Sequence, residues 1–218
     1  MQNDVLGEAR DRFGSVVFFL AGPGAPRSVL DLRGRRVAAA DETSLGGWRT
    51  AWLMLRQAGL DPYRELASLE FMGSHDAVVR AVREGRADAG VVRTDVLERM
   101  AAAGAVALED FATLPPPAGA AESFPYLLST PLYPEWPFAA LRGTPEELIK
   151  RVSAALLAMP PDSPAARAAQ IKGWTPPLEY RPVEDLLQEL RLGGFGRVEP
   201  VTWEDIWRQR GGTVAGVP

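Results

Sequence analysis

The feature that most constrains the fold is an alternation of strand-like and helix-like segments between residues 36 and 103. Apolar runs with the length of buried strands occupy residues 36–40, 69–72 and 89–92. Each run precedes a segment with apolar residues at helical spacing, and these segments are 45–58, 75–84 and 95–103. A glycine that can end the helix follows each one, at Gly59, Gly85 and Gly104. This order predicts βαβ units in an α/β fold, with a parallel sheet and helices on its faces.

The segments on either side of this region are less regular. Residues 1–12 are polar and predict a loose lead-in, whereas the apolar run 14–21 predicts a buried strand. The prolines and small residues of 114–121 predict a linker or an exposed loop. Beyond it, we expect strands at 125–129 and 136–141, separated by a proline-rich turn.

The C-terminal part of the chain is expected to be helical. Thr144 is expected to cap a helix, with Pro145 in its first turn and Glu147 completing a capping box. The predicted buried stripe of this helix consists of Leu148, Ile149, Val152, Leu156 and Met159. Further helices are expected at 164–171, 182–191 and 203–208, and the last eight residues are expected to be disordered.

Composition narrows the class of protein. The 218 residues carry a formal net charge of −4 with basic residues scattered among acidic ones, so no nucleic-acid partner is expected. Cysteine is absent, which excludes disulfides, a thiol nucleophile and a thiolate metal site. The longest apolar run, Val16 to Ala21, is far shorter than the roughly 20 residues that span a bilayer. No signal peptide is evident, and the chain as given is expected to be soluble.

Polar residues gather where the three strands lead into their helices. The junctions read Asp41-Glu42-Thr43-Ser44-Leu45-Gly46-Gly47, Gly73-Ser74-His75-Asp76 and Arg93-Thr94-Asp95. In a parallel sheet they share one edge, where open α/β proteins bind ligands. Free N–H groups at the helix starts attract oxyanions, glycines allow close approach to the backbone, and an arginine adds a bidentate donor. The candidate ligand-binding residues are therefore Thr43, Ser44, Gly46, Gly47, Ser74, His75, Arg93 and Thr94.

The same residues also fit structural roles. A serine or threonine before a helix is an ordinary N-cap. His75 fits a partly buried capping position equally well. Arg93 has Asp88, Asp95 and Glu98 as candidate partners for a surface ion pair. Sequence alone leaves both interpretations open for each position.

Catalysis finds little support in the residues. Ser74, His75 and Asp76 are the residue types of a triad, but neighbours at a helix start project in different directions and form no relay. Gly22-Pro23-Gly24 is too short for a dinucleotide fingerprint, and no spacing indicates a metal site. We therefore expect a binding protein without catalytic residues, cofactor or metal.

An ordered series of motifs resembles the phosphonate-binding type of periplasmic solute receptor. The series consists of Asp31-Leu32-Arg33-Gly34-Arg35-Arg36-Val37-Ala38, Ser44-Leu45-Gly46-Gly47-Trp48, Ala58-Gly59-Leu60-Asp61-Pro62, Gly73-Ser74-His75-Asp76-Ala77 and Gly85-Arg86-Ala87-Asp88-Ala89-Gly90-Val91-Val92. Three further segments, 92–100, 132–139 and 173–183, resemble the extracytoplasmic sensor domains of histidine kinases similar to the tetrathionate sensor. The resemblance covers residues 12–209.

This resemblance implies a type II periplasmic-binding fold. It implies one intact three-layer lobe at 26–124 that binds the ligand, with 1–25 as the lead-in and hinge strand of the first lobe. Residues 125–218 then form the hinge return and the C-terminal helices of that first lobe, which is expected to be incomplete. The candidate residues above are the implied contacts of a ligand held between the two lobes. Relatives often carry an acidic residue at the position of Arg93, so a purely anionic ligand is expected.

The function that the resemblance implies is sensing outside the cytoplasm. We expect the input domain of a two-component sensor histidine kinase, located in the periplasm or on the outer face of the inner membrane. Its ligand is expected to be a small oxyanion of the phosphonate, phosphate, sulfonate or thionate class. Flanking segments would anchor it in the membrane, and a homodimer is an admissible assembly. Two alternatives stay open: a receptor that delivers such an anion to an ABC transporter, and a transferase-type enzyme on the same fold.

Overall fold

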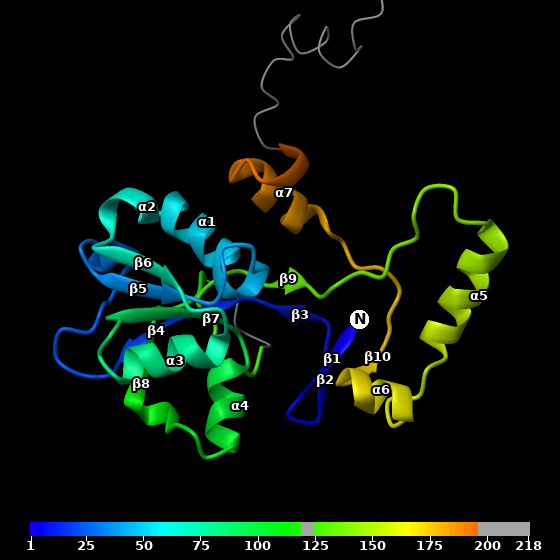
Figure 1. The fold of residues 1–218 in the computed structure, drawn as a ribbon, viewed down its shortest axis with the longest axis horizontal. Helices are drawn as coiled ribbons and strands as arrows, with labels where there is room; N and C mark the ends of the chain where they lie inside the picture. Colours follow the sequence, from blue (N-terminus) through cyan, green and yellow to red (C-terminus); the bar gives the residue numbers. More distant parts are fainter. Residues whose placement is uncertain (119–123, 196–218) are drawn as a thin grey trace, which may run out of the picture.

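A computed structural model describes residues 1–118 and 124–195 of the chain (Figure 1). Its largest sheet has five strands in the order β6-β5-β7-β4-β8. These strands are β4 (Ser15–Leu20), β5 (Arg36–Ala39), β6 (Ser68–Phe71), β7 (Ala89–Arg93) and β8 (Phe111–Thr113). β5 is parallel to β6 and β7, as predicted, whereas β4 runs antiparallel to β7 and β8. The predicted α/β fold is confirmed.

Helices cover both faces of this sheet and complete what we call the central lobe (Figure 1). On one face, the π-helical turn η2 (Leu45–Arg49) runs directly into α1 (Thr50–Gln57), followed by α2 (Pro62–Glu65). On the other face lie α3 (His75–Arg83) and α4 (Val96–Ala102). The three predicted helices of this region begin and end within one residue of these bounds. Short 3₁₀ turns are η1 (Val29–Leu32), η3 (Leu108–Asp110) and η4 (Gly193–Phe195).

The alternation of side chains along β4 explains why both faces are covered. Val16 and Phe18 pack in one buried cluster with residues of α3 and α4. Val17 and Phe19 pack in a second cluster on the opposite face, where Trp48 is fully buried. Because successive strand side chains point to opposite faces, an apolar run such as this one requires a layer of helices on each side.

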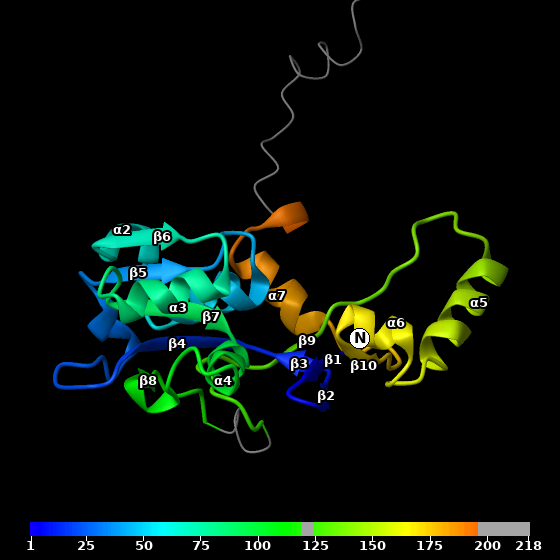
Figure 2. The same ribbon diagram turned by 60° about the horizontal axis from the view of Figure 1, so that its bottom comes forward.

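Two short strands connect the central lobe to the rest of the chain. β3 (Arg12–Phe13) pairs antiparallel with β9 (Tyr133–Pro134). Figure 2 shows this pair between the central lobe and the helices labelled α5 and α6. Next to it, Ser129 N donates a hydrogen bond to Ser15 O at 2.8 Å. Two polypeptide segments therefore run side by side between the lobes, as a hinge requires.

The first lobe is built on a second, smaller sheet in the order β10-β1-β2. Its strands are β1 (Gln2–Val5), β2 (Glu8–Arg10) and β10 (Ile171–Gly173), all antiparallel to their neighbours. The expected loose lead-in at 1–12 is therefore wrong. Gly7 with a positive φ of 92° makes the turn between β1 and β2, and β10 supplies a partner from the far end of the chain.

The strands expected at 125–129 and 136–141 are also wrong. Neither range forms a strand, and the only pairing nearby is the two-residue β9. Side chains take over the hydrogen bonds that a strand would make: Ser129 Oγ donates to Leu114 O at 2.7 Å and accepts from Val17 N at 3.0 Å. Frequent prolines explain the failure, because each removes a ladder donor.

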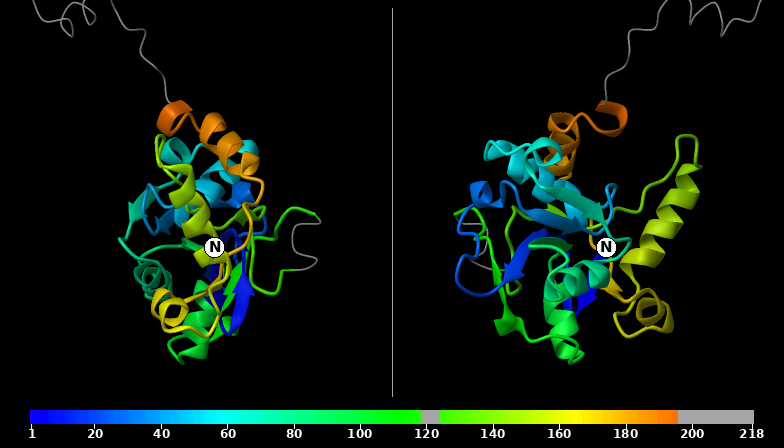
Figure 3. Two further views of the ribbon diagram at one scale, coloured as in Figure 1. Left: turned by 90° about the vertical axis from the view of Figure 1, so that its right-hand side faces the viewer. Right: turned by 60° about the vertical axis from the view of Figure 1, so that its left-hand side comes forward.

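Helix α5 (Glu146–Leu157) corrects a third expectation. Thr144 does not cap it; its hydroxyl donates to Leu141 O at 2.8 Å, and Pro145 precedes the helix. The predicted stripe is not buried: Leu148 (48%) and Ile149 are exposed, and the rest of the stripe is half-buried. Helical periodicity predicts an apolar face but not the surface that covers it. α5 stands apart from the central sheet in Figure 3 (right). A pocket of about 300 Å³ lies between α5 and residues 138–141.

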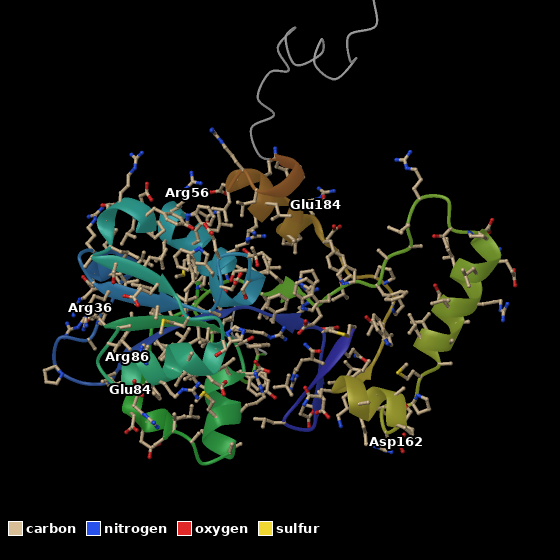
Figure 4. All side chains as sticks on the ribbon, viewed as in Figure 1. Arg36, Arg56, Glu84, Arg86, Asp162 and Glu184 are labelled. Atoms are coloured by element: carbon tan, nitrogen blue, oxygen red, sulfur yellow. The ribbon has the colours of Figure 1, made fainter. Side chains whose placement is uncertain are left out.

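The last two helices contact different parts of the molecule. α6 (Pro164–Ala169) precedes β10, so the predicted helix 164–171 ends early. α7 (Arg181–Glu189) packs against α1 of the central lobe, where Leu186 is buried beside Leu53. Arg56 of α1 donates to Glu189 O at 3.3 Å, and Figure 4 labels Arg56 close to α7. The helix expected at 203–208 and the last eight residues lie outside the described part of the chain.

Candidate functional site

The first strand-to-helix junction places two glycines directly at a helix start. Ser44 caps η2, its Oγ accepting a hydrogen bond from Gly47 N at 3.0 Å. From behind, the buried Ser15 hydroxyl donates to Gly46 O at 2.7 Å and also bonds the hydroxyl of Thr50. The turn is therefore held rigidly by side chains of β4 and α1. Ser15 was not among the predicted residues, since a single serine in an apolar run gives no signal of such a role.

Gly47 is the point where the first and second junctions meet. A Cβ added to Gly47 would lie 2.6 Å from Ser44 Oγ and 2.9 Å from His75 Cε1. A Cβ added to the neighbouring Gly46 would lie 3.2 Å from Arg93 Cγ, so the third junction is adjacent as well. The two distances from Gly47, to Ser44 Oγ and to His75 Cε1, are shorter than any ordinary contact of a Cβ atom. Only glycine fits at this crowded position, where Gly46 and Gly47 are both buried.

The second junction contributes a neutral imidazole. Ser74 caps α3, with its Oγ accepting from Ala77 N at 3.3 Å, and His75 is the first helical residue. Burial and then the positive charges of Arg93 and Arg99 lower the pKa of His75, so the ring is neutral at pH 7. His75 Nδ1 accepts from Arg93 N at 3.4 Å, which leaves Nε2 as the N–H donor of the ring.

The third junction contributes a guanidinium that already has a partner. The Arg93 guanidinium lies 4.5 Å over the Phe13 ring and forms a two-pronged ion pair with Glu135, which is 1% exposed. Asp95 lies further away, with its Oδ1 3.8 Å from Arg93 Nε. Burial raises the pKa of Asp95, against the lowering effect of Arg93 and Arg99.

Of the three partners considered for Arg93, only Asp95 is near it. Asp88 pairs with Arg36 at 2.6 Å, and Glu98 accepts a hydrogen bond from Leu127 N. Sequence reasoning missed Glu135. The only available signal was a carboxylate standing between two prolines in an otherwise apolar segment.

Apart from Ser74, which caps α3, two candidate residues, Thr43 and Thr94, lie away from these contacts. Thr43 is exposed and bonds Asp41 Oδ1 through both N and Oγ1, at 2.7 and 2.6 Å, in a local turn. Thr94 is buried, and its Oγ1 accepts from Gly14 N at 3.2 Å beside the hinge. The structure thus brings together Ser44, Gly46, Gly47, His75 and Arg93, a set that we call the Gly47 junction.

The arrangement offers donors to an anion and little else. Two helix starts, the His75 ring and the stem of Arg93 meet at the Gly47 junction, while the Arg93 guanidinium pairs with Glu135; the helix starts and the imidazole N–H favour negative charge. Within 1–118 and 124–195, no three or more His, Asp or Glu side chains gather in a way that would hold a metal ion. None of the described helices is both long and apolar enough to cross a membrane.

Comparison with known families identifies the chain. Residues 6–180 match the family described as ABC transporter, phosphonate, periplasmic substrate-binding protein. The chain belongs to this phosphonate-binding family. The resemblance inferred from the ordered motifs is therefore confirmed.

One relative of the chain is the tetrathionate sensor histidine kinase TtrS of Salmonella typhimurium. The two sequences are 37% identical over 165 residues, which is 74% of this chain and 26% of the kinase. The chain thus spans about a quarter of the length of that relative.

Solved structures agree on the fold of this member of the family. PhnD1 of Prochlorococcus marinus, in complex with methylphosphonate, has a TM-score of 0.59 at 17% identity, covering 83% of this chain and 67% of that chain. XAC2383 of Xanthomonas citri, bound to ATP, also has a TM-score of 0.59, at 19% identity, covering 87% and 67%. The type II periplasmic-binding fold expected from the sequence is confirmed.

Proposed function

We propose that this chain is the ligand-binding input domain of a sensor histidine kinase and that it recognises a small oxyanion. The observation that carries the proposal is the meeting of two helix starts and Arg93 at Gly47. Ser44, Gly46, Gly47, His75 and Arg93 would contact the anion, while Ser74 holds α3 in place. Thr43 would flank the entrance, and Thr94 would support the contacts through the hinge. The anion class is phosphonate, phosphate, sulfonate or thionate.

The chemistry at the Gly47 junction suits an oxyanion better than a neutral or cationic ligand. The first turn of η2 carries the partial positive charge of a helix start, and because Ser44 Oγ already accepts from Gly47 N, an anion would gain from the dipole of the turn. His75 supplies a neutral N–H donor, so it adds a hydrogen bond without requiring protonation. Arg93 supplies paired donors in the geometry of a carboxylate, phosphonate or sulfonate.

Two observations bear on the choice between sensing and transport. The 37% identity to a tetrathionate sensor kinase favours sensing, with 26–124 as the ligand-binding lobe and 1–25 and 125–218 completing the hinge and the other lobe. Sensing of this kind takes place outside the cytoplasm, with flanking segments as the membrane anchor and a homodimer as the working form. The family description favours the second candidate, a receptor that delivers the anion to an ABC transporter.

Titration calorimetry on the chain tests the binding proposal. The panel is inorganic phosphate, methylphosphonate, methanesulfonate and tetrathionate, and at least one member is expected to bind. Ser44→Ala and His75→Ala are expected to weaken that binding at least tenfold, because each removes a group at the Gly47 junction. Ser163→Ala is the matched control, since Ser163 caps α6 with the same Oγ to N–H bond, at 3.1 Å, in the other lobe.

The outcomes separate clearly. Heat of binding in the wild type and Ser163→Ala, with loss in the two site variants, supports the assignment. Silence of the wild type toward all four anions contradicts an oxyanion function. Equal binding by all variants contradicts the location of the site.

A further inference from the structure

We propose that Glu135 competes with the bound anion for Arg93 and so sets the affinity of the Gly47 junction. This inference rests on the proposed function. It concerns a residue outside the three junctions, contributed by the segment that follows β9 at the hinge.

The position of Glu135 is fixed by contacts from both lobes. Its backbone N donates to Asp11 O at 2.8 Å, and the Tyr180 hydroxyl donates to its backbone O. Its carboxylate accepts from Asn3 Nδ2 of β1 at 2.8 Å and from both terminal nitrogens of Arg93. A buried carboxylate needs donors that compensate its charge, and among the described residues Arg93 is the side chain that forms an ion pair with Glu135.

Arg93 stands between this carboxylate and the glycine turn. Its Cγ is 3.2 Å from the position of a Cβ on Gly46, so the side chain leaves β7 directly beside the proposed anion contacts. It then extends over the Phe13 ring to Glu135. The stem therefore lies at the Gly47 junction, while the charged end is turned toward the hinge.

The charges explain the consequence for an anion. In this structure the Arg93 guanidinium pairs with Glu135 and lies 3.8 Å from Asp95 Oδ1, while Asp95 Oδ2 accepts from Arg99 Nε at 3.2 Å. An oxyanion arriving at Gly47 therefore meets a guanidinium whose charge is already compensated. It gains the full interaction only when the terminal nitrogens of Arg93 are shared with it or released from Glu135. Removal of the Glu135 charge at constant shape should then strengthen anion binding.

The test is calorimetry on Glu135→Gln with the same four anions. We expect affinity to rise at least tenfold over the wild type, equivalent to about 1.4 kcal/mol. Arg93→Gln should bind weakly, and the double variant Glu135→Gln with Arg93→Gln should gain nothing over Arg93→Gln. Glu65→Gln is the control: Glu65 pairs with Arg33 at 2.7 Å on the exposed surface, and its loss should leave binding unchanged.

A purely structural role for Glu135 predicts the opposite result, because a looser hinge would weaken anion binding. Unchanged or weaker binding by folded Glu135→Gln, with a wild type that binds, overturns the competition while the proposed function stands. If neither protein binds any of the four anions, the proposed function itself fails. If Glu135→Gln does not fold, NMR on the wild type provides the test. The ¹⁵N resonance of the Arg93 side chain must shift when an anion that binds is added, and an unchanged resonance overturns the proposed competition for Arg93.

Discussion

Substitution of Gly47 by alanine tests the site geometry most directly. The added methyl group would lie 2.6 Å from Ser44 Oγ, 2.8 Å from Ala40 Cβ and 2.9 Å from His75 Cε1. Two of these atoms belong to short, tightly placed side chains, so the turn itself must shift. Overpacking of this kind costs about 1–3 kcal/mol, and disturbance of the Ser44 cap adds about 1 kcal/mol. The better helix propensity of alanine offsets about 0.5–1 kcal/mol, leaving a net loss of about 1–3 kcal/mol.

Urea denaturation and calorimetry measure the two consequences of Gly47→Ala. The midpoint should fall by an amount equivalent to about 1–3 kcal/mol, and anion binding should be lost because the methyl group displaces Ser44 and His75 from their positions at the junction. Gly194→Ala is the matched control, since a Cβ there meets nothing within 4 Å and its φ is not positive. A Gly47→Ala protein with wild-type stability refutes the packing argument, and one with wild-type affinity refutes the anion site.

Two further predictions concern stability. Leu55→Ala, at a fully buried position of α1, should cost about 2–5 kcal/mol, whereas Leu148→Ala on α5 should change stability by less than about 1 kcal/mol. Equal urea midpoint shifts for the two variants would show that α5 is covered after all. The pKa of His75 is lowered from 6.5 by burial and Arg93, so the unfolded chain binds this proton more readily and stability should fall as the pH decreases below 6.5. His75→Gln should flatten that decline, and an identical pH profile for the variant would contradict a neutral buried imidazole.

The central lobe was predictable because its signals are local. A strand buried on both faces such as β4, or a helix with one apolar face such as α3, is encoded in a window of about ten residues. Capping residues at strand ends are equally local, which is why the sequence predicts helix starts at Ser44 and Ser74. Parallel order of β5, β6 and β7 then follows from the short right-handed connections.

The first lobe was not predictable because its pairings are long-range. β1 is polar and four residues long, and its strand pairing depends on β2, which follows directly, and on β10, some 170 residues later. The prediction that one face of α5 is buried was wrong for a related reason. The helical periodicity is present, but no described element covers Leu148 or Ile149. Local patterns specify which face is apolar, and tertiary contacts alone decide whether that face is buried.

The same distinction governs the candidate site. The position of Arg93 at a strand end follows from local sequence, but its electrostatic state depends on Glu135, 42 residues further along the chain. A free arginine at a strand end attracts an anion with a full positive charge. When the arginine is paired with a buried carboxylate, the charge that an incoming anion experiences is one unit lower. Glu135 directly follows β9, so the pairing of β3 with β9 helps to hold it beside Arg93, and under the proposed competition the hinge also sets the charge of the site. Any movement that separates these strands must therefore change anion affinity, even if no residue of the three junctions moves.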